Sequence, residues 1–455
     1  MLHSKRSLLD QPAPPLLPCE YGLGDSHPRP MRISVLVTLE RHAEAGGHVK
    51  CWEKFAAAAA LYPDSVDLAV HFLGESTSVA QISNNVRFVH HAPRFSTRRI
   101  PFLHNDAGHT DLSHHHPGVF AALSDADVVH TTDSFSLGRT GRSFSRQTDC
   151  ALVASIHTDL PKFTYVYADE ILRRTLGPVG RSLGAPWQLP ALLARRAEAK
   201  LARHLRACDL VLISKDEDEA AWTRRLTRTR VARLRRGIDT HVFSPRHRDR
   251  RWLAHVHGIE QGLPVLFYAG RIDSGKNVLV LAQAAAAIIS RGIDLRVILA
   301  GTGGEVAKVQ SLLGERAICL GHLDQASLAR YYANADVFVF PSTTEVAPNV
   351  VLEAKASGLP VLAATADGGG QYVVDGKDGY SLPSTAPEIW ADRLVTLLAN
   401  REQLGAFGRA ARLWAETAWP SWSTVFAEDL LPAWRHAIDR RRLRYSAATE
   451  CRPSR

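Results

Sequence analysis

Residues 340–361 read FPSTTEVAPNVVLEAKASGLPV and place one carboxylate, Glu345, in a loop and a second, Glu353, in the helix that follows. The apolar run DVFVFPS just before them predicts a buried strand. Pro348 suits the first turn of a helix, which we expect to run through Glu353 and to end at Gly358 as its C-cap. Ligands of parallel α/β sheets bind outside the carboxyl ends of the strands, so both glutamates can border one pocket above the free N–H groups of this helix. That combination favours a ligand with hydroxyl and phosphate groups, such as a nucleotide sugar.

The same strand-and-helix alternation occurs twice along the chain, from RISVLVTL to DLVLIS and from LPVLFYAG to PVLAAT. This cadence predicts two Rossmann-like domains with parallel sheets and helices on both faces, joined by a polar linker near residues 235–248. We expect a first domain over residues 31–236, a second over 237–417, and a helix over 418–440 that packs back across both. Residues 1–30 read as a Pro-rich disordered lead-in, and residues 441–455 as a basic disordered tail.

Composition indicates a soluble globular protein of 455 residues with a formal net charge of +9. The six cysteines are scattered without a CxxC pair, which favours free thiols and a cytoplasmic location. The amino-terminal segment lacks the pattern of a signal peptide, and no apolar run reaches the roughly 18 to 20 residues that a membrane span needs. The positive charge is concentrated in residues 193–236, with thirteen basic and six acidic residues, and in residues 435–455, with seven and two.

Several loops that follow predicted strands carry residues suited to an anionic ligand. Arg271 and Lys276 follow the strand LFYAG at a helix start, where a planar fork and a point charge can clamp phosphate. His157 ends the strand ALVASI, where an imidazole can hydrogen-bond a sugar hydroxyl or serve only the structure. Gly46 and Gly47, before a helix, can admit an anion or form an ordinary loop.

Three further loops are less specific. Gly301, Gly303 and Gly304 can open room for a nucleotide or form a tight turn. The acidic residue that a dinucleotide-binding fingerprint requires is absent, so the glycines alone do not decide between the two. His322 follows another strand, where the loop can offer groups to a base edge. The glycines of residues 368–370 can clear a close neighbour.

Taken together, residues 237–383 resemble the retaining nucleotide-sugar glycosyltransferases with two facing Rossmann-like domains, the GT-B fold, and among them family 4, also called glycosyl transferases group 1. The matching segments stand in order as RRGIDTHVFSP, YAGRIDSGKN, ILAGTGG, PSTTEVAPNVVLEAKASGLPV and DGKDGY. The first domain matches through AGGHV and IHTDLP.

This resemblance implies a role for each matching position. Arg271 and Lys276 would neutralise the donor diphosphate, Glu353 would accept hydrogen bonds from the ribose, and Glu345 would hold hydroxyls of the donor sugar. Elsewhere, His157 would reach a sugar hydroxyl across the cleft. The remaining donor contacts would come largely from backbone groups and loop glycines, at Gly47, Gly301, Gly303, His322, Asn349 and Val350. No metal or other cofactor is expected, since fixed cations and a helix terminus would do its work.

The chain departs from the family pattern after Glu345, where Val346, Ala347 and Pro348 replace the aromatic residue and glycine of many members. Pro348 has no N–H to donate, so the mode of sugar selection stays open. We expect a UDP- or GDP-sugar donor and same-face attack with retention, in which the leaving phosphate accepts the proton of the acceptor. No carboxylate is clearly placed as a nucleophile for a covalent intermediate.

Other interpretations remain open at this point. Sugar-nucleotide epimerases and glycan phosphorylases share the architecture, and a non-catalytic module that binds nucleotide or nucleic acid would use the basic segments. The string Asp125-Ala126-Asp127 and the histidines of HTDLSHHHPG are candidate metal ligands, although both read better as loops, the second as an exposed, mobile one. No nucleic-acid partner is expected, because aromatic residues are not interleaved with the arginines.

The acceptor is not specified by any motif. The basic helix LLARRAEAKLARHLRAC and the Arg-rich tail can hold the protein against anionic lipid. A lipid-linked or saccharide acceptor, in glycolipid or polysaccharide synthesis at the inner face of the membrane, is therefore our expectation.

Overall fold

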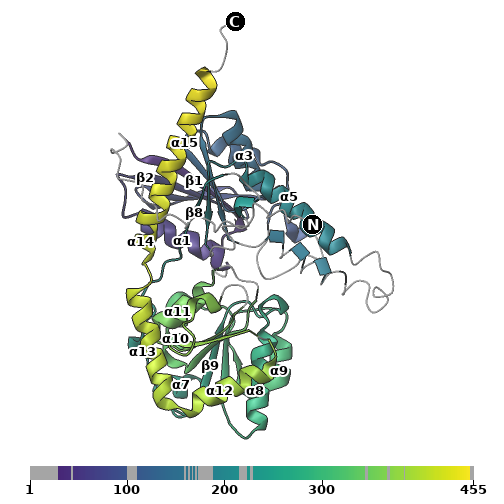
Figure 1. The fold of residues 1–455 in the computed structure, drawn as a ribbon, viewed down its shortest axis with the longest axis vertical. Helices are drawn as coiled ribbons and strands as arrows, with labels where there is room; N and C mark the ends of the chain where they lie inside the picture. Colours follow the sequence, from purple (N-terminus) through teal and green to yellow (C-terminus); the bar gives the residue numbers. More distant parts are fainter. Residues whose placement is uncertain are drawn as a thin grey trace, which may run out of the picture.

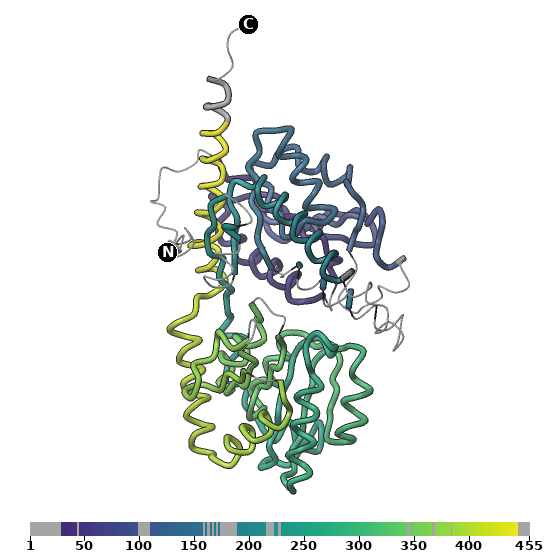
Figure 2. Tube along the Cα trace, turned by 45° about the vertical axis from the view of Figure 1, so that its right-hand side comes forward, coloured from purple at the N-terminus to yellow at the C-terminus, as the bar shows by residue number. Residues whose placement is uncertain are grey.

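A computed structural model describes residues 29–42, 45–99, 110–157, 188–214, 229–343, 347–365, 369–383 and 385–450, with short pieces between 160 and 172 and at 223–225. Two α/β domains lie one above the other, and the carboxyl-terminal helices run along both of them (Figures 1 and 2). The GT-B arrangement predicted from the sequence is confirmed by two separate parallel sheets with a helix that crosses back to the first domain.

The first domain is built on an eight-stranded sheet in the order β3-β4-β2-β1-β5-β6-β7-β8. All neighbouring strands are parallel except β3 and β4. Its strands are β1 Met31–Glu40, β2 Val66–Leu73, β3 Ser78–Ser83, β4 Val86–His91, β5 Val128–Thr131, β6 Ala151–Ile156, β7 Leu210–Ile213 and β8 Val231–Arg233. Its helices are α1 Gly47–Ala59, the 3-10 turn Thr97–Arg99, α2 Pro117–Ala122, α3 Ser136–Gln147 and α5 Gln188–Leu205.

A six-stranded parallel sheet in the order β11-β10-β9-β12-β13-β14 forms the second domain. Its strands are β9 Val265–Ala269, β10 Arg296–Ala300, β11 Ala317–Cys319, β12 Val337–Phe340, β13 Val361–Ala364 and β14 Gly379–Leu382. The helices are α7 Arg250–His257, α8 Val278–Ser290, α9 Val306–Leu313, α10 Gln325–Asn334, α11 Asn349–Ala356, α12 Pro387–Ala399 and α13 Arg401–Thr417. Single 3-10 turns cover Pro245–His247, Ser274–Lys276, Gly314–Arg316 and Gly370–Tyr372.

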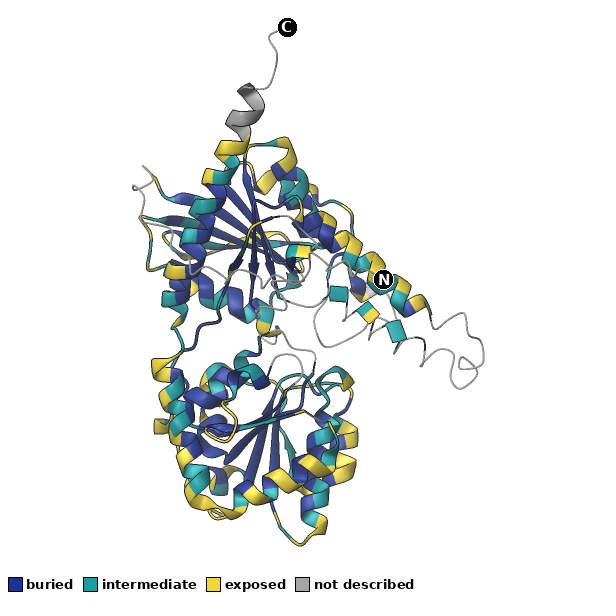
Figure 3. Ribbon diagram, in the orientation of Figure 1, coloured by how far each residue is buried: buried dark blue, intermediate teal, exposed yellow. Residues whose placement is uncertain are grey.

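The inner strands of each sheet are buried on both faces, as Figure 3 shows by their dark colour, whereas the edge strands β3 and β11 are partly exposed. The apolar β-branched strands predicted this, because a parallel sheet sandwiched between helices has no solvated face. Leu234 packs in the core of the first domain and Ile238 in that of the second, so the chain passes between domains at the three residues that separate them.

The carboxyl-terminal segment returns to the first domain through α14 Trp422–Val425, a π-helical turn Phe426–Leu430 and α15 Leu431–Glu450. Phe426, Trp434 and Ile438 are buried in the core of the first domain, and Trp434 Nε1 donates to His130 Nδ1 on β5 at 3.1 Å. The prediction that this helix ends at residue 440 and that disorder begins at residue 441 is wrong, because α15 continues to Glu450.

An ion pair and two hydrogen bonds to backbone carbonyls hold α15 to the first domain beyond Asp439. Arg444 Nη1 lies 2.8 Å from Asp209 Oδ1, Arg440 donates to the Asp209 carbonyl at 2.9 Å, and Arg441 to that of Thr148 at 2.9 Å. Arginines of the expected tail therefore anchor the helix to the first domain. The lead-in before residue 29 and the last five residues lie outside the described part of the chain.

Candidate active site

A cleft of about 1110 Å³ lies between the two domains and is lined by residues from both. The carboxyl ends of β1, β5 and β6 contribute to one wall, and those of β9, β10 and β12 to the other. Most of the predicted site residues meet here, namely Gly47, His157, Arg271, Lys276, Gly301, His322, Asn349, Val350 and Glu353. Glu345 lies outside the described residues.

Arg271 and Lys276 stand on the loop between β9 and α8. Arg271 Nη1 forms an ion pair with Asp273 Oδ2 at 2.9 Å, and Tyr268 Oη donates to the Arg271 carbonyl at 2.7 Å. Asp273 also accepts from the Lys276 backbone N–H at 3.1 Å, which caps the 3-10 turn that carries Lys276. One aspartate thus orders the loop that places both cations on the cleft.

Glu353 projects from α11 on the same wall. Tyr332 Oη donates to its Oε2 at 3.2 Å, and burial raises the pKa of Glu353 to about 7 against the opposing effects of this hydrogen bond and of Lys54. Pro348 is the N-cap, one residue before the helix, and Gly358 has a φ of +71°, as expected of a residue that ends a helix. The first N–H groups of α11, at Asn349 and Val350, line the cleft.

His157 lies at the carboxyl end of β6 in the opposite wall. Arg236 Nη2 lies 2.9 Å from its Nδ1, and Ser155 Oγ lies 2.6 Å from its Nε2. A guanidinium can only donate, so Nδ1 accepts and the proton resides on Nε2. Burial holds the pKa of His157 well below its usual value, with His48 and Arg236 adding to the effect. The imidazole is therefore neutral, and both of its nitrogens are engaged.

The glycines of the site differ in what they accommodate. A Cβ on Gly47 would meet no atom within 4 Å, so nothing in the described protein requires a glycine there, and the space remains open to a ligand. Gly301 lines the cleft, but a Cβ would lie 1.9 Å from the Gly270 carbonyl oxygen, so backbone packing demands this glycine. Gly303 is not brought to the cleft; a Cβ there would lie 2.3 Å from the Ile272 oxygen.

Sequence reasoning missed three side chains of the cleft region. Arg236 reaches the cleft from the linker, Lys54 from α1, and Tyr332 supports Glu353 from α10. The only signal for Arg236 is its position in RRGID, directly after a strand and before the linker glycine. Nothing in the local sequence marks the other two, because they meet Glu353 only through the tertiary fold.

The alternative metal motifs have structural partners instead. Asp127 accepts from the Arg32 backbone and pairs with Arg29 at 2.8 Å, at the amino end of β5, away from the cleft. His116 is buried and caps α2 by accepting from the Val119 N–H at 3.2 Å, so the expectation of an exposed, mobile loop is wrong at this residue. His109 lies outside the described residues.

Comparison with known proteins identifies the class of this fold and cleft. Residues 263–400 match the family of glycosyl transferases group 1. A GDP-mannose-dependent alpha-mannosyltransferase of Mycolicibacterium smegmatis is 32% identical over 325 residues, which cover 70% of this chain and 76% of that protein. A D-inositol 3-phosphate glycosyltransferase of Arthrobacter is 34% identical over 46% of this chain and 51% of its own length.

Solved structures agree on the fold. Sucrose-phosphate synthase from Thermosynechococcus elongatus superposes with a TM-score of 0.63 at 17% identity, covering 92% of this chain and all of that one. Anabaena Alr3699/HepE, solved with UDP-glucose, gives a TM-score of 0.61 at 18% identity over 88% and 99% of the two chains.

This chain therefore belongs to the glycosyl transferases group 1 family and has the GT-B fold. It is a hexosyltransferase that uses a nucleotide-sugar donor.

Proposed function

We propose that this chain moves a hexosyl group from a UDP- or GDP-sugar to a lipid-linked or saccharide acceptor with retention of anomeric configuration. The observation that carries the proposal is a single cleft in which Arg271, Lys276 and Glu353 on one domain face Gly47 and His157 on the other. Cations and free N–H groups suit the diphosphate, and a carboxylate suits the ribose hydroxyls.

Charge that builds on the diphosphate as the C1–O bond breaks would be stabilised by Arg271, Lys276 and the amino end of α11. These fixed groups take the part that a metal ion plays in other transferases, so we propose that the reaction needs no metal. A neutral His157 would add no charge beside the oxocarbenium-like centre, and its Nε2 proton would reach a sugar hydroxyl only by exchanging Ser155 Oγ for it.

Transfer without a covalent glycosyl-enzyme intermediate is supported by how the carboxylates of the cleft are engaged. Those described along it already hold cations, hydroxyls or backbone N–H groups: Glu53, Asp133, Asp239, Asp324 and Glu353. A nucleophilic carboxylate would have to be free to attack C1. Attack of the acceptor on the face that the diphosphate leaves, with the phosphate accepting the proton, needs no such residue.

The donor is tested by a thermal-shift screen of UDP- and GDP-sugars. GDP-mannose comes first, because two mannosyltransferases that use it are among the related proteins. A Lys276→Ala variant should lose the stabilisation by the active donor, whereas Lys377→Ala, which removes an exposed lysine outside the cleft, should keep it. Nuclear magnetic resonance of the product then reports the anomeric configuration, and an inverted product rejects retention. Turnover of the nucleotide sugar alone into an epimer would reject transfer.

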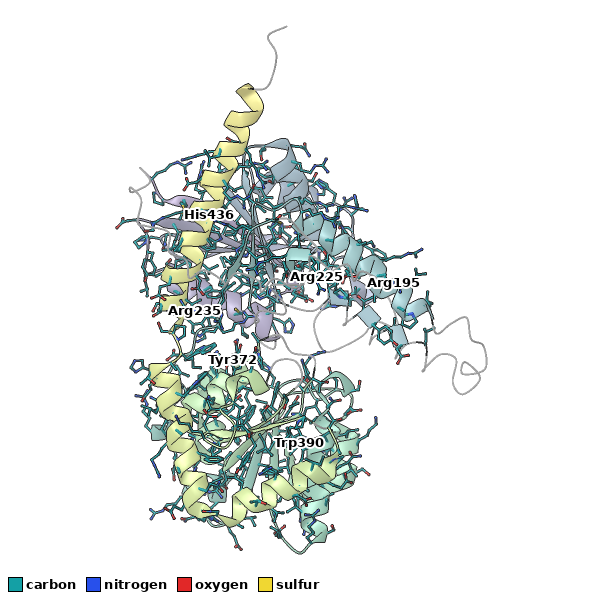
Figure 4. The ribbon with its side chains drawn as sticks, viewed as in Figure 1. Arg195, Arg225, Arg235, Tyr372, Trp390 and His436 are labelled. Atoms are coloured by element: carbon teal, nitrogen blue, oxygen red, sulfur yellow. The ribbon has the colours of Figure 1, made fainter. Side chains whose placement is uncertain are left out.

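A membrane-proximal acceptor is supported by α5. Arg195, Arg196 and Lys200 are exposed along it, beside the exposed apolar side chains of Leu189 and Leu192 (Figures 3 and 4). Such a surface suits an anionic bilayer, at about 1 kcal/mol for each basic residue near the headgroups.

No helix in the described part of the chain is long and apolar enough to cross a membrane. We therefore propose peripheral attachment at the cytoplasmic leaflet. The protein should sediment with vesicles that contain phosphatidylglycerol at low salt, and a variant with Arg195, Arg196 and Lys200 changed to Gln should not. Failure of the unmodified protein to sediment would reject attachment.

A further inference from the structure

Arg236 is an unusual cation in this protein. Among the lysines and arginines that the structure describes, only Arg236 and Lys355 are buried, at 5% and 0% exposure. Lys355 follows the ordinary rule for a buried charge, because its Nζ lies 2.8 Å from Asp378 Oδ2. No carboxylate of the described residues forms an ion pair with Arg236, so its charge has no protein counterion there.

The groups that Arg236 does contact are neutral. Nη1 contacts the thiol of Cys51 on α1, and Nη2 donates to His157 Nδ1 at 2.9 Å. Burial raises the pKa of the Cys51 thiol and lowers that of His157, which keeps both groups uncharged. Nε is buried and has no acceptor. Such an arrangement is costly for a guanidinium unless an anion joins it, since an unpaired buried ion loses its hydration without compensation.

The contacts of the neighbouring arginine show which way this charge faces. Residues 234–239 carry no regular secondary structure, and the side chains of Arg235 and Arg236 contact different segments. Arg235, labelled at the junction of the domains in Figure 4, pairs with Asp429 at 2.7 Å on the crossing segment. Arg236 points the other way and lines the cleft together with Gly47 at the amino end of α1 and His157.

We propose that Arg236 binds a phosphoryl group of a substrate, from the first-domain wall of the cleft. A guanidinium fits a phosphoryl group because its planar donors bond two oxygens at once. The open space beside Gly47 and the free N–H groups at the start of α1 complete the anion site. The phosphoryl group belongs either to the donor diphosphate or to a phosphate on the acceptor.

This inference rests on the proposed transfer from a nucleotide-diphosphate sugar. Calorimetry on the full chain distinguishes a failure of this inference from a failure of the proposed function. Titrations with GDP and UDP first identify the nucleotide that the unmodified protein binds. Inorganic phosphate is then titrated into protein saturated with that nucleotide. Arg236→Gln is compared with Arg233→Gln, which removes an exposed arginine three residues earlier, outside the cleft.

If the donor diphosphate is the ligand, Arg236→Gln weakens nucleotide binding by about 10- to 100-fold, the effect of losing a charge-assisted hydrogen bond. If the acceptor phosphate is the ligand, nucleotide binding stays and the binding of inorganic phosphate is lost. Either result, with Arg233→Gln unchanged, supports the proposal. If Arg236→Gln binds both ligands as the unmodified protein does and melts at a lower temperature, Arg236 has only a structural role. That result would overturn the proposal. Absence of nucleotide binding by the unmodified protein would instead refute the proposed function.

Discussion

Replacing Tyr332 by Phe should shift the pH dependence of donor use without disturbing the fold. Its hydroxyl donates to Glu353 at 3.2 Å and favours the ionised carboxylate, which the proposed function needs as the acceptor for the ribose. The ring packs against Phe267 and Phe338 with centroid distances of 4.9 and 5.3 Å, contacts that Phe preserves. The variant therefore removes one hydrogen bond and little else.

The size of the effect follows from that bond. A hydrogen bond to a charged group contributes about 1.5–3 kcal/mol, and a separation at the long end of the normal range favours the lower figure. Since about 1.4 kcal/mol corresponds to one pH unit, the midpoint should rise by about one unit from the value of about 7 set by burial. A carboxyl group with a raised pKa is protonated below that midpoint, so donor use falls as the pH falls through it. The variant should then lose about five-fold in kcat/KM at pH 7 and almost nothing at pH 9.

The assay is kcat/KM for the nucleotide sugar measured from pH 6 to 9. Tyr331→Phe is the matched control, because this neighbouring hydroxyl bonds His257 Nε2 at 2.8 Å and not Glu353. His48 and His157 do not titrate in this range, since burial lowers the pKa of the first to about 3 and of the second well below its usual value. Coincident profiles for Tyr332→Phe and the unmodified enzyme would refute the assignment of the titrating group to Glu353.

Three further predictions concern stability and the glycines. Lys355→Met should lower the free energy of unfolding in urea by about 3–5 kcal/mol, because the buried Asp378 loses its cation and keeps only the Val374 N–H as a donor; a double variant that also changes Asp378 to Leu should regain most of the loss. Gly301→Ala should fail to fold or melt far lower, since its Cβ would lie 1.9 Å from a backbone oxygen, whereas Gly47→Ala should melt normally and bind the donor more weakly. Stability should fall as the pH drops below about 6.5, because burial lowers the pKa of His71 to about 3 and the unfolded imidazole takes up the proton; His71→Gln should reduce this slope in urea titrations at pH 7 and 5.5.

The second-domain side of the site follows from local sequence. Arg271 and Lys276 come directly after a strand that reads as buried, and the rule for parallel sheets places them at the ligand edge without knowledge of any distant contact. Glu353 is located by the proline before its helix and the glycine after it. Strand, turn and cap signals lie within a few residues of the side chain in each case. The local sequence is therefore sufficient to predict the place of these three side chains in the fold.

What the sequence could not show depends on contacts between distant segments. Tyr332 stands 21 residues before Glu353, on a helix whose apolar pattern reports only that one face is buried. The arginine-rich composition of the end of α15 predicts disorder. Asp209, more than 230 positions earlier, forms an ion pair with Arg444 and anchors the helix to the first domain. Composition describes a segment in isolation and cannot include a partner from the other end of the chain.

The two arginines of the linker, Arg235 and Arg236, make the spacing of the cations in the cleft depend on how the two domains are oriented. The Arg235 backbone N–H donates to Asp429 at 2.8 Å, and its side chain pairs with the same carboxylate on the turn that packs in the first-domain core. Arg236 is thereby held to the first domain, whereas Arg271 and Lys276 are held to the sheet of the second. The distance between these cations is set by the angle between the domains. A phosphoryl group bound by Arg236 on one side and by the Arg271 loop on the other would stabilise the angle at which both can reach it. If that group belongs to the donor diphosphate, affinity for the donor and the angle between the domains are one equilibrium, because a ligand shifts a conformation only by the contacts it makes better in that conformation.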